Sequence, residues 1–253
     1  MRLTRLNCPI WEGKSCLHWG LVLGAISFAL TSAGAADQAH QAASQERGAF
    51  ALLYSGSDVA TDSAFFHQGA RVSFSGNLAQ SGLIAEALLG YGIYRYETGN
   101  VPGGIVTGQA WLGRAGLGYQ WVKPNGAIAF LAGMETQRHD LSLDDLGNPV
   151  SGRETGAMAT LDGWWKPQPN IMLSGYATAT TAFRSHYARM RAATPAPYFD
   201  EIWVGAEVAV AGNENYEQGR AGLFVSGIAL WPGHIGIAAG GYADKDGKSG
   251  FYG

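Results

Sequence analysis

The stretch Gln109-Ala-Trp-Leu-Gly-Arg-Ala-Gly-Leu-Gly-Tyr-Gln-Trp121 decides the fold class. In an extended strand, one face carries Trp111, Ala115, Leu117, Tyr119 and Trp121, and the other carries Arg114, Gly116, Gly118 and Gln120. Successive side chains of a strand point to opposite sides, so this pattern predicts one apolar and one polar face. The stretch is longer than the usual strand of about 5–6 residues and reaches the roughly 9–11 residues that a membrane strand needs. We interpret it as one strand of a membrane-spanning β-barrel.

The same unit recurs from residue 48 to the end of the chain. Segments 64–75 and 171–183 alternate in the same way. The candidate strands are 48–57, 63–76, 82–97, 105–122, 127–138, 155–166, 171–187, 199–211, 216–230 and 234–243. The sequence therefore predicts an all-β fold over residues 48–253, an antiparallel up-and-down transmembrane β-barrel of about ten to twelve strands.

Composition favours the same class. Charged residues make up 15% and hydrophobic residues 47% of the chain, whereas soluble domains average about 25% charged residues. A soluble protein of this kind would expose large apolar patches, but the outer face of a barrel meets acyl chains. The net charge of −3 and the lack of any Lys/Arg run exclude nucleic acid as a partner.

The connections between candidate strands alternate in length. Short turns are predicted at 77–80, 123–126, 166–170 and 212–215, and longer loops at 98–104, 139–154 and 188–198. Outer-membrane barrels have short periplasmic turns and longer outer loops. The connections 58–62 and 231–234 depart from this rule, because both are short where a long loop is expected. Aromatic residues near strand ends are predicted to form interfacial girdles: Tyr91, Tyr94, Tyr96, Tyr119, Trp121, Trp164, Trp165, Tyr187, Trp231 and Tyr242.

The N-terminus has the pattern of a secretory signal, predicted over 1–35 with cleavage near Ala35. A basic start precedes the apolar segment 19–30, and Ala33 and Ala35 follow with the spacing of a signal peptidase site. The apolar segment is shorter than the roughly 20 residues of a spanning helix. Residues 36–47 are expected to be a flexible lead-in. Both cysteines, Cys8 and Cys16, fall within the signal, so the mature protein is expected to have no thiol site.

Several Gly- and aromatic-rich motifs resemble the cellulose biosynthesis protein BcsS family in their order along 48–253. They are Tyr54-Ser-Gly-Ser-Asp58, Gly90-Tyr-Gly-Ile-Tyr-Arg-Tyr96, Gly118-Tyr-Gln-Trp-Val122, His139-Asp-Leu-Ser-Leu-Asp-Asp145, Val204-Gly-Ala-Glu-Val208, and Gly212-Asn-Glu-Asn-Tyr216 with Arg220. The resemblance implies a bacterial outer-membrane protein associated with cellulose production, and it carries over no catalytic or binding residue. One departure is the end Gly250-Phe-Tyr-Gly253, where a further strand is expected after a turn. Without that strand, either the barrel closes with 234–243 or the chain is truncated.

The polar faces of the strands supply the candidate site residues. The predicted lumen-facing residues are His67, Arg71, Glu86, Arg114, Glu135, Asp162, Glu201, Glu207 and Arg220. A narrow barrel fills its lumen with side chains, and charges there are expected to pair because an isolated buried charge is costly. The alternative is a polar path for a solute or polymer.

No motif predicts catalysis, a cofactor or a metal: HExxH and GxSxG are absent. Ser185 and His186 are the only neighbours that could serve an outer-membrane lipid-modifying hydrolase. Asp140, Asp144 and Asp145 could bind a divalent cation, although a solvated acidic loop is favoured. A soluble periplasmic β-sandwich or lipocalin-like binder is a third hypothesis. The expected partners are outer-membrane lipid and lipopolysaccharide, with cellulose synthase components or the glucan itself as candidates from the resemblance.

Overall fold

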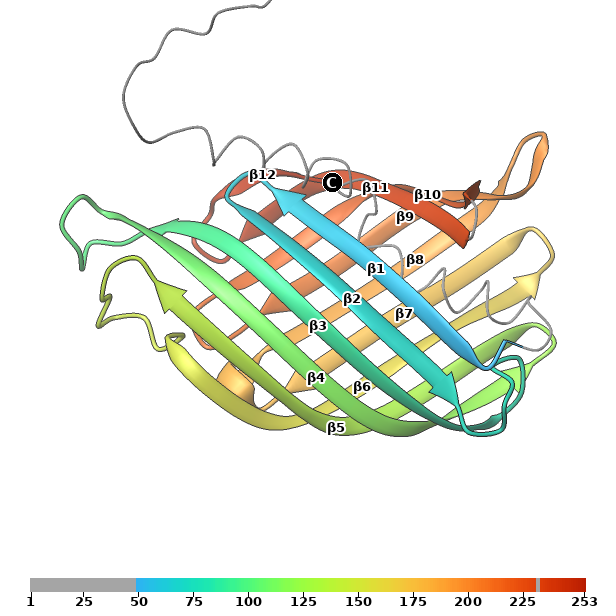
Figure 1. The fold of residues 1–253 in the computed structure, drawn as a ribbon. Coiled ribbons are helices and arrows are strands. Elements are labelled where there is room, and N and C mark those ends of the chain that lie inside the picture. The colour runs from blue at the N-terminus through green and yellow to red at the C-terminus, as the bar shows by residue number, and fades with distance from the viewer. Residues whose placement is uncertain (1–48, 231–232) are drawn as a thin grey trace, which may run out of the picture. The chain divides into compact units, whose positions relative to one another are not determined.

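A computed structural model describes residues 49–230 and 233–253, which form a closed antiparallel barrel (Figure 1). Its strands are β1 Ala51–Ala60, β2 Ser63–Ser73, β3 Gly82–Glu97, β4 Ile105–Lys123, β5 Gly126–Leu141, β6 Gly152–Gln168, β7 Ile171–Thr180, β8 His186–Ala196, β9 Phe199–Gly212, β10 Glu217–Leu230, β11 Gly233–Asp244 and β12 Ser249–Tyr252. A 3₁₀ turn, η1 Ala182–Arg184, joins β7 to β8. The predicted signal 1–35 and lead-in 36–47 lie outside the described residues.

Each strand pairs with its neighbours in sequence, and β12 pairs with β1, so the predicted all-β, up-and-down barrel is confirmed with twelve strands. Segment 82–97 coincides with β3, which pairs with β4 from Gly82↔Gln120 to Glu97↔Ile105. The strand expected after the last turn is β12. No helix in the described part of the chain is long and apolar enough to cross a membrane.

The prediction of a single strand at 171–187 followed by a loop at 188–198 is wrong. The chain turns back at η1, where Phe183 and Arg184 adopt φ values of 49° and 48°, and β8 then runs through most of the predicted loop. Positive φ is uncommon for residues other than glycine, so the residue types at this turn do not predict it. Pro195 is the last-but-one residue of β8 and is followed at once by a register shift, as expected for a proline in a sheet.

The extra strand reverses the side on which every later connection lies. One end of the barrel, here called the loop end, carries 61–62, 98–104, 142–151, 181–185, 213–216 and 245–248. The other, here called the turn end, carries 74–81, 124–125, 169–170, 197–198 and the β10–β11 connection. The predicted short turn 212–215 therefore lies at the loop end, which corrects its assignment. The β10–β11 connection lies at the turn end, which removes one of the two departures from the length rule, but the short connection 213–216 becomes a new departure at the loop end.

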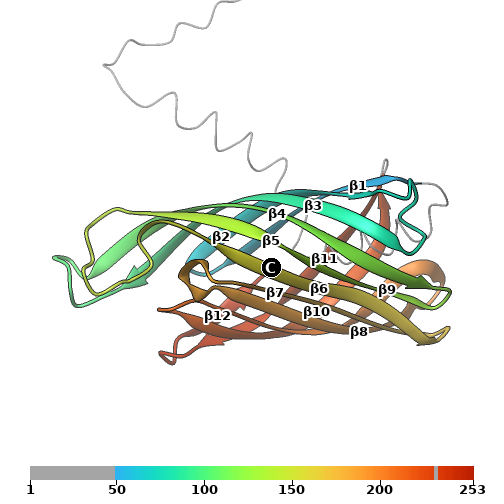
Figure 2. The same cartoon turned by 90° about the horizontal axis from the view of Figure 1, so that it is seen from below.

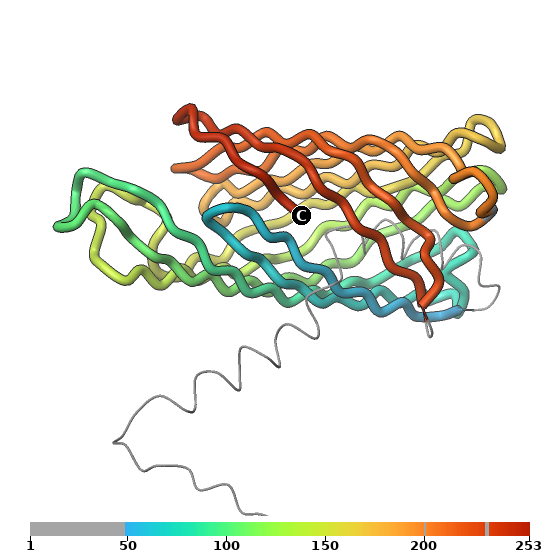
Figure 3. Tube along the Cα trace, turned by 90° about the horizontal axis from the view of Figure 1, so that it is seen from above, coloured from blue at the N-terminus to red at the C-terminus, as the bar shows by residue number. Residues whose placement is uncertain are grey.

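The outward positions of the strands form an apolar belt around the barrel wall. Exposed side chains on this belt include Leu53, Leu89, Ile93, Trp111, Leu117, Trp121, Phe130, Met134, Leu161, Trp165, Met190, Val208, Leu223, Ile237 and Phe251. Figures 2 and 3 show the strands tilted and wound around one interior, with the β3–β4 hairpin extending beyond its neighbours. The wall thus presents apolar residues outward and most of its charged residues inward.

The predicted aromatic girdle is partly wrong. Tyr119, Trp121 and Trp165 are exposed on the outer wall as expected. Tyr94 instead bonds to His139, and Trp164 lies under the Lys166 ammonium. Alternation explains the difference, because residues next to each other in a strand face opposite sides. Trp231 lies outside the described residues.

The barrel closes through a short contact between β1 and β12. Their register is defined by the pair Ala60↔Tyr252, and β12 pairs with β11 over Gly240–Ala243. Two backbone hydrogen bonds join Val59 and Gly253, at 2.8 and 2.9 Å. Side chains inside the lumen add to this seam, as described below.

Candidate functional site: the polar lumen

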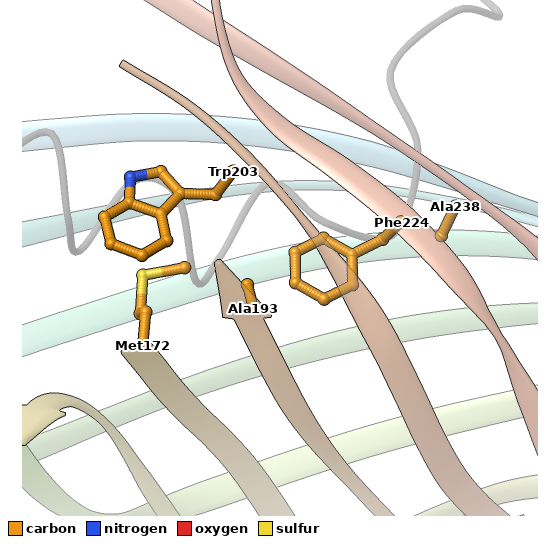
Figure 4. Close-up of a cluster of buried hydrophobic side chains, with 5 residues drawn as sticks. All are labelled: Met172, Ala193, Trp203, Phe224 and Ala238. Atoms are coloured by element: carbon orange, nitrogen blue, oxygen red, sulfur yellow. The ribbon is translucent and has the colours of Figure 1, made fainter. Parts of the chain in front are cut away.

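Apolar side chains fill the interior near the turn end. Met172, Ala193, Trp203, Phe224 and Ala238 form one cluster and are all at least 93% buried (Figure 4). A second cluster joins Ile84, Ala129 and Leu131 to Leu78, which the connection 74–81 brings to the interior. Gln120 holds that connection by donating to the Leu78 and Gln80 carbonyls at 2.9 and 2.7 Å. This end of the lumen is therefore packed like a protein core.

The central feature of the lumen is Arg71 on β2, whose side chain is only 1% exposed. It donates to Glu86 on β3 at 2.5 and 2.8 Å, and to Asp162 on β6 at 2.6 and 3.3 Å. Asp162 comes from a strand four places away around the barrel, so these bonds span the lumen. One guanidinium thus satisfies two buried carboxylates, an arrangement we call the Arg71 hub.

A second group surrounds Arg114 on β4. Its guanidinium lies 4.0 Å from Glu135 on β5 and donates to the Tyr176 hydroxyl on β7 at 2.5 Å. The guanidinium carbon also lies 5.8 Å from the centre of the Tyr176 ring. Gln137 continues the network by donating to Glu135 at 2.7 Å.

Two more arginine–carboxylate pairs lie toward the β1–β12 seam. Arg191 on β8 forms an ion pair with Glu207 on β9 at 2.5 Å, and its Nε donates a hydrogen bond to the same carboxylate at 2.7 Å. Tyr252 on β12 donates to the other oxygen of Glu207 at 2.8 Å. Arg220 on β10 forms an ion pair with Asp58 on β1, and its guanidinium carbon lies 5.3 Å from the Tyr252 ring. Contacts from β8, β9 and β10 therefore converge on the strands that close the barrel.

Seven of the nine predicted lumen residues take part in these groups, and two do not. His67 is half-buried between the rings of Tyr54 and Phe65, at 6.4 and 6.0 Å. Glu201 lies on the same alternation as Trp203 and Glu207, but it is exposed close to the turn end.

Sequence reasoning missed Asp58, Arg189 and Arg191. Asp58 was counted as part of a connection, although β1 continues to Ala60. Both arginines were assigned to the predicted loop 188–198, yet they are 4% and 5% exposed. The signal that could have found them is the alternation Arg189-Met-Arg191, which places two arginines on one face of a strand.

A polar cluster closes the lumen toward the loop end. Asp145 accepts from Tyr96 at 3.1 Å and from Asn100 at 3.0 Å. Asn148 donates to Tyr96 and accepts from Asn215, which links three connections. Desolvation raises the pKa of Asp145, but hydrogen bonds from Asn100, Tyr96 and the backbone outweigh it and place the pKa below its ordinary 3.8.

The other acidic residues of the long loop do not join Asp145. Asp140 pairs with Arg138 at 3.0 Å, and Asp144 is exposed. Among residues 49–230 and 233–253, no group of three or more His, Cys, Asp or Glu side chains is placed to hold a metal ion.

The family model of cellulose biosynthesis protein BcsS matches residues 52–253. The chain belongs to this family. Its role therefore lies in cellulose biosynthesis, and its family domain coincides with the barrel. The chain matches no curated protein and no solved structure.

In this BcsS family member, Ser185 and His186 do not form a nucleophile–base pair. Ser185 lies 3.4 Å from the buried Gln137, with its hydroxyl turned to the lumen. His186 is exposed and packs over Gly212 on the neighbouring strand. Adjacent residues of an extended chain face opposite sides, so the imidazole is directed away from the hydroxyl that it would have to activate.

Proposed function

We propose that this chain is a non-enzymatic accessory protein of bacterial cellulose biosynthesis or secretion, located in the outer membrane of a Gram-negative bacterium. Its role there is to anchor a complex or organise the envelope, and it does not conduct the glucan. The observation that carries the proposal is a family match over a barrel whose outer wall is apolar and whose lumen is closed by bridging ion pairs.

The apolar belt supports the membrane location. Leu53, Leu89, Leu117, Leu223 and Phe251 are 81%, 73%, 64%, 71% and 82% exposed. Against water, this area would cost about 25 cal/mol per Å² and would favour association. Against acyl chains it carries no such cost, so a bilayer is the environment that the wall fits. The same reasoning disfavours a soluble periplasmic binder.

The packed lumen supports an organising role over an export pore. A glucan would have to displace the Arg71 hub, whose side chains span the interior, and the apolar cluster at the turn end. Displacing these side chains would leave buried charges without compensation, which is strongly unfavourable, so passage of a glucan through the hub is disfavoured. No acid–base pair suited to glycosyl transfer is found among the contacts of the described residues. Polymerisation is therefore assigned to another protein.

A deletion experiment tests the role. Deleting the gene in a cellulose-producing host should reduce or alter secreted cellulose while membranes retain synthase activity in vitro. Loss of that activity would refute a downstream role. If the deletion left the amount, attachment and fibre form of the cellulose unchanged, the proposed role in cellulose secretion would be refuted.

Fractionation tests the location. The mature protein should begin near Ala36, sediment with outer membranes and migrate faster on gels before heating than after it. Recovery in the soluble periplasm would refute the membrane location and favour a soluble binder. Lipid hydrolysis that is lost on His186→Ala, with the heat-modifiable form intact, would instead support the hydrolase.

A further inference from the structure

A groove of about 770 Å³ lies on the outer wall of the barrel, across strands β4 to β8. Its walls include Trp121, Leu161 and Trp165, which are 48%, 47% and 51% exposed. Met190 on β8 is 68% exposed and closes the far side. The groove therefore belongs to the apolar outer face and is separate from the lumen network.

Small residues on three neighbouring strands create this hollow. Gly163 on β6 lies opposite Gly175 on β7, and Ala177 on β7 lies opposite Ala188 on β8. A Cβ atom on Gly175 would meet only the backbone oxygen of Arg189 within 4 Å, at 3.8 Å. The space above Gly175 is thus left empty by the protein's own side chains, and a larger residue there would fill it.

One positive charge stands at the turn-end rim of the groove. Lys123, the last residue of β4, lines the groove together with Asn125 and is exposed. None of the carboxylates in the described part of the chain forms an ion pair with it. Trp121, two residues earlier on the same face, suits the boundary between acyl chains and headgroups. An ammonium beside an apolar trough is complementary to an amphiphile with an anionic head.

We propose that this groove holds an acyl chain of a phospholipid whose phosphate contacts Lys123. The inference rests on the membrane location in the proposed function and adds a specific lipid site to it. The chain lies over the Gly175 floor between Trp165 and Met190. The lysine selects an anionic headgroup.

Native mass spectrometry of the mature barrel tests the site. The protein is released from micelles that contain equal amounts of phosphatidylglycerol and phosphatidylcholine. Gly175→Leu fills the trough, and Lys123→Gln removes the charge. Gly219→Leu is the matched control, because a Cβ at position 219 would meet no atom within 4 Å and the residue lines a neighbouring outer hollow. The two hollows meet at Ala188, Arg189 and Met190, but the one beside Gly219 is lined by no lysine. Heat-modifiable migration verifies that each variant is folded.

The wild type should retain phosphatidylglycerol over phosphatidylcholine by roughly fivefold, the factor that one lysine contributes at an anionic surface. Lys123→Gln should lose this preference and still retain lipid. Gly175→Leu should lower total retained lipid at least about fivefold because the apolar contact is gone, whereas Gly219→Leu should behave as wild type.

Three results would overturn the proposal. The first is that Gly175→Leu retains as much lipid as the wild type. The second is that Gly219→Leu loses as much lipid as Gly175→Leu. The third is a wild-type dimer that Gly175→Leu converts to a monomer, which would make a second copy of the chain the occupant of the groove. Failure of the proposed function is recognised separately. A barrel that selects lipid in this assay while the deletion strain secretes normal cellulose leaves the site standing and rejects the role in secretion.

Discussion

Replacing Arg71 with methionine should destabilise the barrel by about 3–5 kcal/mol, the cost of leaving a buried charge without its partner. The buried value applies because Arg71, Glu86 and Asp162 have side chains only 1%, 8% and 2% exposed. Two carboxylates lose one shared guanidinium, so the upper half of the range is expected. At about 1.4 kcal/mol per tenfold, the upper half of the range corresponds to roughly three to three and a half orders of magnitude in the folding equilibrium constant.

The assay is urea unfolding of the barrel in detergent, followed by tryptophan fluorescence. Arg95→Met is the matched control, because the Arg95–Asp62 pair is 60% and 42% exposed and should contribute at most about 1 kcal/mol. The combined variant Arg71→Met, Glu86→Gln, Asp162→Asn should recover part of the loss, since it removes both carboxylates together with the guanidinium that they share. A cost for Arg71→Met below that of Arg95→Met would refute the hub, and so would a combined variant no more stable than Arg71→Met.

Three further predictions concern the seam, the wall and the loops. Arg220→Gln and Asp58→Asn should each cost about 1–3 kcal/mol, and a double-mutant cycle should show coupling; additive effects would contradict the ion pair. Gly133→Ala should prevent folding, because the added Cβ would lie 2.0 Å from a backbone oxygen, whereas Gly219→Ala should fold normally. Heat-modifiable migration on gels measures the folded fraction of each variant. Because the pKa of Asp145 is depressed, its contribution to loop order is present above pH 3.8 and lost as pH falls through the lowered pKa. Loop 142–151 of the wild type should therefore become susceptible to proteolysis at acid pH, and Asp145→Asn should remove this pH dependence.

Local periodicity was sufficient for the parts of the fold that depend on one strand at a time. Strand β3 was placed at its observed ends, and Arg71, Glu86 and Arg114 were assigned to polar faces from alternation alone. Alternation works because successive side chains of any extended segment face opposite sides, whatever the rest of the chain does. Alternation also holds in β8, where Arg189 and Arg191 are buried and Met190 is exposed. The start of that strand was missed, because a turn built from Phe183 and Arg184 at positive φ has no residue signature.

The sequence by itself thus determined the class of fold, with an apolar outer wall, a charged interior and strands of membrane length. Only the tertiary structure decided how many strands there are, at which end each connection lies and which charges meet. Arg71 and Asp162 are 91 residues apart and come together because the barrel closes. Strand pairing also leaves the hollow beside Lys123, since Gly163, Gly175 and Ala188 become neighbours only when β6, β7 and β8 pair. Such contacts depend on strand order and register, which periodicity within one strand does not encode.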